Sequence, residues 1–460
     1  SMKKIFAAAT LGLCLGVSAS ALAAPSVYPT GTTIYDPAQA QNGYVLISVD
    51  FKDVYAKVDN RAFFKEAPDY NSPAAVPTAA DSDEVFLIDM NGNVVHSWKD
   101  LGNNKKCYLL PDGHLLSFSE TRSEVTEYDW DGKVVWNFAS KLGPHHDGRR
   151  LPNGNTLILC YETVPDEVIN KVENQTTQWW GTQDRKNAKL RGDILIEVNP
   201  QGKVVWSWSS SEHLDINRYM PLTGMNDWTH GNTLSVIPPN KWYDAGDERF
   251  HPDNIIVDGR EANIIFIISK ATGKIVWKLG PDYDNSPEAK AIGWIIGQHH
   301  AHMIPRGLPG EGNILVFDNG GWAGYGAPNP GAAHGVKAAQ RDYSRVLEID
   351  PVSLKVVWQY TPHEAGFLVP LDASRFYSPF ISSAQRLPNG NTLICEGSDG
   401  RIFEVTSEHE IVWEYVCPYK GHISLPMNWV YRAYRLPYAW VPQAEAPAEK
   451  AIEPLSVKDF

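Results

Sequence analysis

An all-β fold of six repeated, four-stranded antiparallel sheets is predicted by a motif that recurs along the chain. In each copy a turn is followed by two β-branched residues and, in most copies, an aromatic one. The six copies span residues 92–98, 132–138, 202–208, 273–279, 354–360 and 409–415. A second strand-like run precedes each copy, so each pair of runs is expected to form a β-hairpin.

A second hairpin falls between these copies. The run Arg-Leu-Pro-Asn-Gly-Asn-Thr-Leu-Ile occurs twice, at residues 150–158 and 386–394, and weaker versions occupy 110–116 and 304–316. Asn-Gly between strand-forming runs is a strong hairpin signal. Two hairpins make one four-stranded sheet, so six such sheets in tandem predict a six-bladed β-propeller.

The two ends of the repeat predict how the ring closes. Only one strand, residues 44–48, precedes the first outer hairpin, so the first blade lacks an inner strand. Near the C-terminus, residues 430–437 resemble the inner strand at 382–388 but have no partner of their own. We expect this segment to complete the first blade. The propeller should then span residues 24–440, and the Ala-, Glu- and Pro-rich residues 441–460 should form a loosely held tail.

The N-terminus is typical of an exported protein. Lys3 and Lys4 precede an apolar run over residues 5–17, and Ala-Leu-Ala follows at 21–23. This pattern predicts a signal peptide over residues 1–23 and a periplasmic location. The run is short for a membrane span, and no later segment is apolar enough for one.

The composition of the chain indicates which class of binding partner to expect. Lys and Arg number 41 against 54 Asp and Glu, a net charge of −13, which argues against nucleic acid and favours small molecules. The four cysteines beyond the signal peptide do not have zinc-site spacing, and one or two disulfides or free thiols remain open. They are Cys107, Cys160, Cys395 and Cys417.

Loop lengths predict which face carries function. If the strands of a blade are named A to D from the axis outward, the A–B and C–D turns share one face. The B–C and D–A connections share the other, where we expect every long insertion, such as residues 161–190, 320–343 and 361–377. Because a rigid scaffold presents functional loops on one side, the site should lie where A strands begin and B strands end.

Alignment of the A strands predicts the site residues. Five residues before the Leu or Ile at the far end of these strands, matched positions hold Lys105, His146, Asn232, His299, Ser382 and Tyr431. His230 lies two residues before Asn232, hence on the same side of its strand. Arg260 ends the neighbouring B strand. Six blades are thus expected to direct polar groups at a common axis.

Several other polar and aromatic residues near these positions can be explained by structural roles. Strand alternation should turn His145, His300 and His302 away from the centre. Asp147 and Asp318 could either orient a histidine or cap a turn. The repeated Trp residues are expected to pack between outer strands rather than stack on a cofactor.

The chain resembles the bacterial arylsulfate sulfotransferases that act without phosphoadenosine phosphosulfate. The matching motifs are Gly-Thr-Thr-Ile (31–34), Asn-Gly-Tyr-Val-Leu (42–46), His-His-Asp (145–147), Asp-Trp-Thr-His-Gly-Asn (227–232), Asn-Ile-Ile-Val-Asp-Gly-Arg (254–260) and Gln-His (298–299). The resemblance implies a periplasmic six-bladed propeller that moves a sulfuryl group from an aryl sulfate to a phenol, with no cofactor. It implies that His299 is the transiently sulfated residue. His146, His230, Asn232 and Arg260 would hold the sulfuryl oxygens, and Tyr431 would contact substrate.

Two features depart from that family. Its members carry an N-terminal β-sandwich that supports dimerisation, but here residues 31–34 follow the signal peptide almost at once, so we expect no such domain, and a homodimer stays open. The run Gln-His-His-Ala-His at 298–302 is also richer in histidine than the family pattern, which leaves His300 as a rival nucleophile.

The residue types suit sulfuryl transfer. A neutral imidazole can attack the sulfur of an aryl sulfate and form an N-sulfuryl intermediate, which divides one hard displacement into two easier ones. Arg260 and Asn232 would stabilise charge on the equatorial oxygens. Either His146 or His230 would protonate the leaving phenolate and later deprotonate the acceptor. Aromatic loop residues could either stack on the aryl group or serve as packing, and they include Trp179, Trp180, Trp322 and Tyr325.

Two other functions fit parts of the pattern. Three axial histidines could bind a divalent metal, as in propeller lyases, although Arg260 would repel a cation and no carboxylate shares the inward register. Alternatively the propeller could bind a ligand or protein without catalysis.

Overall fold

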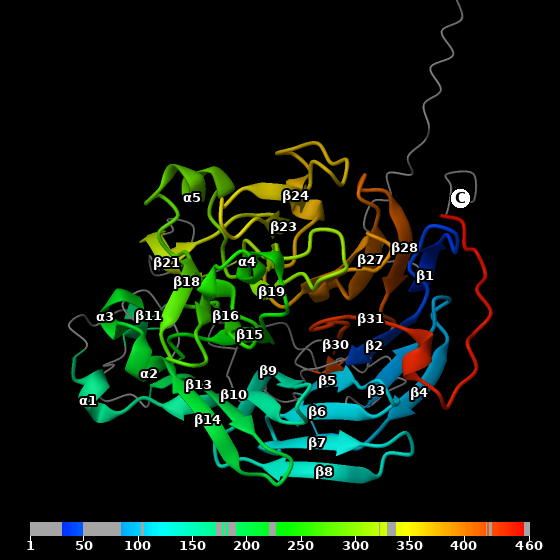
Figure 1. The fold of residues 1–460 in the computed structure, drawn as a ribbon. Coiled ribbons are helices and arrows are strands. Elements are labelled where there is room, and N and C mark those ends of the chain that lie inside the picture. The colour runs from blue at the N-terminus through cyan, green and yellow to red at the C-terminus, as the bar shows by residue number, and fades with distance from the viewer. Residues whose placement is uncertain are drawn as a thin grey trace, which may run out of the picture.

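The computed structural model describes residues 30–48, 84–102, 105–171, 177–178, 181–182, 190–219, 227–321, 323–328, 337–419, 421–422 and 426–454. The expected signal peptide lies outside these residues. The described chain forms six antiparallel sheets around a common centre, which is the predicted six-bladed propeller (Figure 1).

Each blade contains four strands in the predicted order from the axis outward. Blade 1 comprises β31 (Arg435–Leu436), β2 (Tyr44–Ser48), β3 (Val85–Ile88) and β4 (Val94–Trp98). Blade 2 comprises β5 (Lys105–Leu109), β6 (Leu115–Ser119), β7 (Glu124–Tyr128) and β8 (Val134–Ala139). Blade 3 comprises β9 (Pro144–Arg150), β10 (Thr156–Thr163), β13 (Arg191–Val198) and β14 (Val204–Ser209).

The other three blades repeat this order. Blade 4 comprises β15 (Gly231–Val236), β16 (Ile255–Gly259), β17 (Ile264–Ile268) and β18 (Ile275–Leu279). Blade 5 comprises β19 (His299–Met303), β20 (Ile314–Asp318), β23 (Arg345–Ile349) and β24 (Val356–Tyr360). Blade 6 comprises β25 (Ser383–Arg386), β26 (Thr392–Glu396), β27 (Arg401–Val405) and β28 (Ile411–Val416). All six predicted outer strands are therefore confirmed.

The ring closes as the sequence predicts. The short C-terminal strand β31 pairs antiparallel with β2, with Tyr44 opposite Leu436 and Val45 opposite Arg435. The structure adds a strand that the repeat did not predict: β1 (Gly31–Tyr35) pairs with β28 as a fifth, outermost strand of blade 6. The tail then returns to β1, where Tyr35 and Ile452 exchange two backbone hydrogen bonds.

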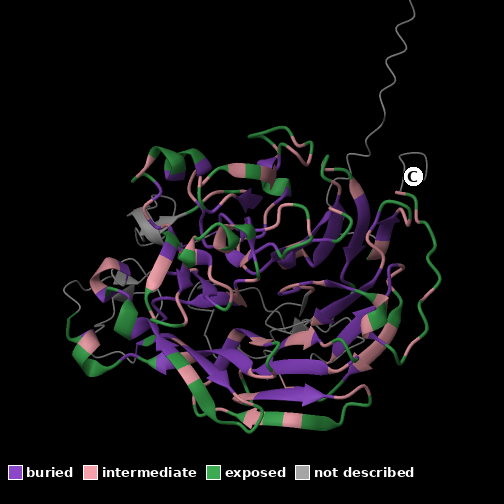
Figure 2. Ribbon diagram, viewed as in Figure 1, coloured by how far each residue is buried: buried purple, intermediate pink, exposed green. Residues whose placement is uncertain are grey.

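The recurring aromatic of the outer strands fastens each blade to the next. Five indole N–H groups donate to a carbonyl in the C–D turn region of the following blade, at 2.7–3.1 Å. The five are Trp136, Trp206, Trp277, Trp358 and Trp413. In blade 1 the same position holds His96, whose Nε2 lies 2.7 Å from the carbonyl oxygen of Trp130. The expectation of a packing role for these residues is confirmed. The outer strand β8 is largely exposed or half-buried, whereas inner strands are mostly buried (Figure 2).

Ring closure gives a stability prediction. The Arg435 side chain is 2% exposed and its Nη1 lies 2.8 Å from Oε2 of Glu404, which is fully buried. Replacing Arg435 by leucine would leave the buried Glu404 carboxylate without its charged partner. We therefore expect the free energy of unfolding to fall by about 3 kcal/mol or more. Chemical denaturation of the wild type and the variant measures this difference in unfolding free energy. Arg306→Leu is the control, because the Arg306–Asp244 pair is solvent-exposed and should change stability by less than about 1 kcal/mol.

Insertions between the strands carry short helices and hairpins. The helices are α1 (Asp166–Ile169), α2 (Ser210–His213), α3 (Ile216–Tyr219), α4 (Lys241–Asp244) and α5 (Pro287–Ile292), with 3₁₀ turns η3 (Glu248–Phe250), η5 (Ala373–Arg375), η6 (Gly397–Asp399) and η7 (Tyr438–Trp440). The small hairpins are β11–β12 (Thr177–Gln178, Gly181–Thr182), β21–β22 (Ala323–Pro328, Lys337–Ala339) and β29–β30 (Gly421–His422, Pro426–Met427).

One expectation about the insertions is wrong. The A–B connection of blade 4 contains α4 and η3, so one long insertion lies on the short-turn face. Its Trp242 indole donates to the carbonyl of Gly312 in the neighbouring blade. Within the described parts of the chain, no helix is long and apolar enough to cross a bilayer. All four cysteines that the sequence left open are free thiols, and three of them are buried.

Candidate active site

The inner strands of blades 3, 4 and 5 depart from regular alternation where the predicted residues lie. His146, His230 and His300 all have positive φ, between 50° and 58°. The pairing of these strands with their B strands shifts register at the same places. Positive φ is uncommon for residues other than Gly, although His, Asn and Asp adopt it more often than most, and such residues concentrate at functional sites. These bulges redirect side chains that a flat strand would turn away.

His299 is held in one tautomer. The backbone N–H of Ile381 in blade 6 donates to His299 Nε2 at 3.2 Å, so that nitrogen carries a lone pair. Its Nδ1 lies 2.8 Å from Oδ1 of Asn319. The Asn319 amide nitrogen donates to the carbonyls of Ser378 and Ile381, which fixes its oxygen toward the imidazole. His299 therefore has its proton on Nδ1 and a lone pair on Nε2.

Asn319 is thus a positioning residue, and its removal gives a prediction. In Asn319→Leu, His299 would be free to rotate or change tautomer, so kcat should fall by about a hundredfold with little change in KM. Long-range ¹H–¹⁵N spectra should show the loss of the Nδ1–H tautomer. Asn313→Leu is the matched control, because Asn313 is buried at the other end of β20 and bonds Glu348. Equal loss of activity in both variants would contradict the assignment.

His146 belongs to a relay with two neighbours. Its Nδ1 lies 2.7 Å from Nδ1 of His145, and His145 Nε2 lies 3.1 Å from Oδ1 of Asp193. Burial lowers the pKa of His145, but Asp193 outweighs it and the pKa is raised. Burial and the adjacent cations hold the pKa of His146 well below its ordinary value. The raised pKa of His145 favours its protonated form, whose Nδ1–H would donate to Nδ1 of His146 and leave the His146 proton on Nε2.

His230 is paired with Asp227 from the same motif. Its Nδ1 lies 2.7 Å from Asp227 Oδ2, and its backbone N–H donates to Oδ1 of that carboxylate. Burial raises the pKa of Asp227, but contact with His230 and nearby cations bring it below its ordinary value. The rings of His230 and His146 lie 4.7 Å apart. The predicted site histidines of blades 3 and 4, His146 and His230, therefore lie next to each other. An anionic Asp227 orients the His230 ring.

Arg260 and Asn232 complete the cluster on blade 4. Gly259 pairs with Gly231, and the Arg260 N–H donates to the carbonyl of His230, so Arg260 lies at the predicted rim. Its guanidinium also contacts Glu261. Asn232 is fully buried, and its amide donates to the carbonyl of Gln298 at 3.2 Å. Arg260 thus brings positive charge to the side of the centre where an anion would bind.

Tyr431 forms a wall of the same centre. Its hydroxyl donates to the carbonyl of Asn232, and its ring centroid lies 5.9 Å from that of His146 and 6.2 Å from that of His299. The ammonium of Lys106 lies 4.3 Å from the ring centroid. Ser382 bonds Ser378 instead of facing the centre. The side chains of Lys105, Trp179, Trp180, Trp322 and Tyr325 lie outside the described residues.

The electrostatics of His299 give a pH prediction. Burial, and next the charge of Arg260, hold the pKa of His299 well below 6.5. The imidazole therefore stays neutral and nucleophilic as the pH falls through 6.5, where an ordinary histidine would become protonated. Single-turnover sulfation by a donor whose phenolate leaves without protonation should keep its rate between pH 7.5 and 5.5. A decline centred near pH 6.5 would contradict this.

His300, the rival nucleophile, lies on the other side of the strand. Its Nε2 is 2.8 Å from the Tyr434 hydroxyl. Tyr434 in turn receives a hydrogen bond from Arg149. Next to it, Arg432 donates to Asp147 and to the carbonyl of Asn232. These contacts form a polar layer beneath the histidine centre, and they favour His299 over His300. Neither Asp147 nor Asp318 orients a histidine: Asp318 instead binds Arg341 and Arg345.

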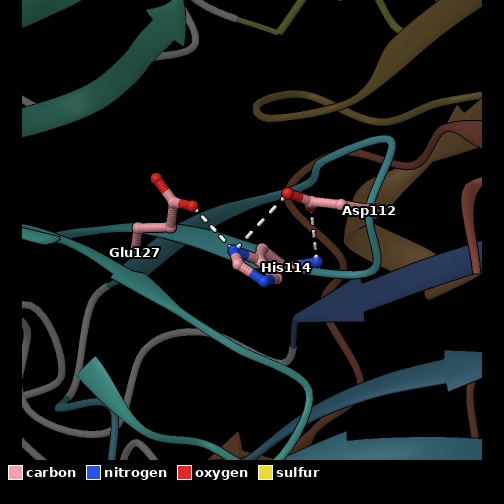
Figure 3. Close-up of side chains that lie close together, drawn as sticks. All are labelled: Asp112, His114 and Glu127. Atoms are coloured by element: carbon pink, nitrogen blue, oxygen red, sulfur yellow. Dashed lines mark hydrogen bonds and ion pairs between the residues drawn. The ribbon is translucent and has the colours of Figure 1, made fainter. Parts of the chain in front are cut away.

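The group of side chains with the geometry of a possible metal site lies away from the axial histidines. Among the described residues, three ligand-type side chains converge at Asp112, His114 and Glu127 on the short-turn side of blade 2 (Figure 3). His114 Nδ1 is 2.8 Å from Glu127, whose other oxygen is 2.9 Å from Arg150, so a cation already occupies this carboxylate. In the described chain, the axial histidines do not form such a group. This geometry gives the metal alternative no support.

The fold is a six-bladed propeller, and histidine, asparagine and arginine side chains gather at its axis. The chain belongs to the Arylsulfotransferase (ASST) family, whose sequence model matches residues 49–432. Family and fold together support an aryl sulfotransferase that acts on small molecules. A comparison with curated protein sequences gives no match.

Solved structures resemble this chain at low identity and low TM-score. A protein of unknown function from Bacteroides caccae has a TM-score of 0.45 and 13% identity, covering 85% of this chain and 98% of its own. Streptogramin B lyase has a TM-score of 0.38 and 10% identity, covering 73% and 76%. The WD40 β-propeller domain of Doa1 has a TM-score of 0.35 and 10% identity, covering 68% and 69%.

Proposed function

We propose that the protein is a periplasmic aryl-sulfate sulfotransferase that works by a ping-pong mechanism through sulfated His299. The observation that carries this proposal is the fixed tautomer of His299, whose Nε2 lone pair accepts a hydrogen bond from the Ile381 N–H. The charges of Arg260 and His230 act on this imidazole, and the rings of His230 and His146 lie 4.7 Å apart. A buried, neutral imidazole is a suitable nucleophile, and fixed donors around it suit a trigonal SO₃ group in transfer.

In the first half-reaction, His299 Nε2 attacks the sulfur of the aryl sulfate. The N–S bond forms as the bond between sulfur and the aryl oxygen breaks. Protonated His230, hydrogen-bonded to Asp227, gives its proton to the departing phenolate, as the histidine held by a carboxylate does for the leaving group in serine-protease triads. Arg260, Asn232 and the Nε2–H of His146 donate to the sulfuryl oxygens. The Ile381 N–H, released from Nε2, is available to the same oxygens.

In the second half-reaction, neutral His230 takes the proton of the acceptor phenol. The phenol oxygen attacks sulfur, the N–S bond breaks, and His299 returns to its neutral form. Protons and charge therefore balance over the cycle without a cofactor. Of the two candidates for acid and base, this assigns the role to His230 and leaves His146 as a donor.

Peptide mapping tests the proposal. The protein is exposed to a chromogenic aryl sulfate without acceptor, digested at neutral or alkaline pH, and analysed by mass spectrometry. One sulfuryl group is expected on the peptide that contains His299, with one equivalent of phenol released in a burst. Sulfation elsewhere, or phenol release that depends on added metal after chelation, would refute it.

The periplasmic location is tested separately. A tagged full-length chain expressed in a Gram-negative host should appear in the periplasmic fraction without residues 1–23. Retention of those residues on a cytoplasmic product would refute export. The oligomeric state can be measured on the same material by light scattering.

A further inference from the structure

A cavity of about 530 Å³ runs along the axis beside the inner strands of blades 1 and 2. At one end its wall includes Pro305, Pro388 and Pro437, exposed residues at the ends of A strands, so it opens on the short-turn face. At the other end the wall includes Lys106, His146 and Tyr431. The cavity, called here the axial funnel, therefore joins the face opposite the long loops to the histidine centre.

The wall of the axial funnel is cationic. The described lining residues include six cationic side chains and no Asp or Glu, although the whole chain carries a net charge of −13. The six are Lys106, Arg149, Arg150, Arg386, Arg432 and Arg435. The four carboxylates that pair with the five arginines (Glu127, Glu348, Asp147 and Glu404) do not line the cavity. A ligand inside the funnel would therefore meet the arginines before it meets their partners.

Two further observations indicate what fits there. Arg435 is almost fully buried in the wall, and its Nε and Nη2 have no hydrogen-bond partner. Flat apolar surfaces alternate with the charges: the guanidinium of Arg149 lies 4.7 Å from the ring centroid of Tyr108 and 5.6 Å from that of Tyr434, and Trp440 lines the mouth. Arginine–aromatic layers of this kind suit a planar, negatively charged ligand.

We propose that the axial funnel is the entrance and aryl-binding pocket for an aromatic monoanion, whose charged end reaches His146, at the edge of the histidine centre, from the short-turn face. This rests on the proposed function. One aryl pocket then serves both half-reactions: the phenol formed from the donor leaves through the funnel before the acceptor enters it. Donor and acceptor would then use this pocket in turn, as the proposed ping-pong order requires.

A carboxylate at the funnel mouth tests the proposal. Leu308 lines the mouth and lies outside the histidine centre. The probe is naphthalene-2-sulfonate, whose carbon–sulfur bond prevents transfer, and binding is measured by calorimetry. We expect Leu308→Glu to weaken binding at least tenfold by charge repulsion, and Leu308→Gln, of equal size, to stay within about threefold of the wild type. Val135→Glu adds the same charge on the outer strand and should leave binding unchanged.

The outcomes separate this inference from the proposed function. Equal affinity of Leu308→Glu and Leu308→Gln, or no binding by the wild type, would overturn the funnel. If the probe binds with the expected pattern but no sulfuryl group reaches His299, the funnel stands and the transfer chemistry fails. Melting temperatures of the two Leu308 variants should agree, so that a folding defect is recognised.

Discussion

Replacing His299 by alanine is expected to abolish sulfuryl transfer. The imidazole is the protein group that bonds to sulfur in the proposed reaction, and deleting a nucleophile of this kind lowers kcat by roughly 10⁴ to 10⁶. The variant should show no phenol burst and no sulfated peptide. Because His299 touches Asn319 and Ile381 inside a buried centre, its melting temperature must be measured beside its activity.

His300→Ala is the matched control for that experiment. His300 is the next residue in the chain and equally buried, but its ring contacts Tyr434 in the polar layer beneath the centre. It should retain sulfation of His299, with a change in kcat of less than about tenfold. Loss of the sulfated peptide in His300→Ala, with retention in His299→Ala, would transfer the nucleophile to His300.

Replacing Arg260 by methionine is expected to lower kcat by about 10² to 10³, since a preorganised donor to developing charge is lost. The substitution should also raise the pKa of His299, because the Arg260 charge contributes to holding it low. The acid limb of the single-turnover profile should then move toward higher pH. Steady-state kinetics and that profile measure the two effects.

Arg260→Lys separates charge from geometry. A lysine keeps the positive charge beside Glu261 and His299 but cannot present two parallel N–H groups to two oxygens. We expect an intermediate loss of about tenfold in kcat and little shift in the acid limb. If Arg260→Met had the same kcat as the wild type, Arg260 would not stabilise the transition state.

Most of the fold was predictable because its signals are local. The Val-Val-Trp motif and the Asn-Gly turns each specify a hairpin within a dozen residues, and all six blades follow from them. The strand β1 was not predicted, because it adds to blade 6 through pairing of Tyr35 with Trp413, far away in the sequence. The insertion with α4 was missed because nothing in its sequence marks the face on which it emerges.

The site was predictable as far as strand register extends. Register brought His146, Asn232, His299 and Tyr431 to one axis, and the end of a B strand brought Arg260. The same argument, applied to the residue after β20, would have found Asn319, which occupies in blade 5 the place of Arg260 in blade 4. His145 was set aside by alternation, and the bulge at His146 explains why it nevertheless contacts the centre.

The sequence by itself determined the six-fold repeat, the closure by the C-terminal strand and the residue types that meet at the axis, since each depends on local turn chemistry and two-residue periodicity. Only the tertiary structure decided which histidine nitrogen carries a proton, which carboxylate serves which imidazole, and that a cationic funnel opens on the far face. These depend on backbone N–H groups, bulges and side chains from blades that are distant in sequence, and the repeat pattern leaves their relative positions undefined.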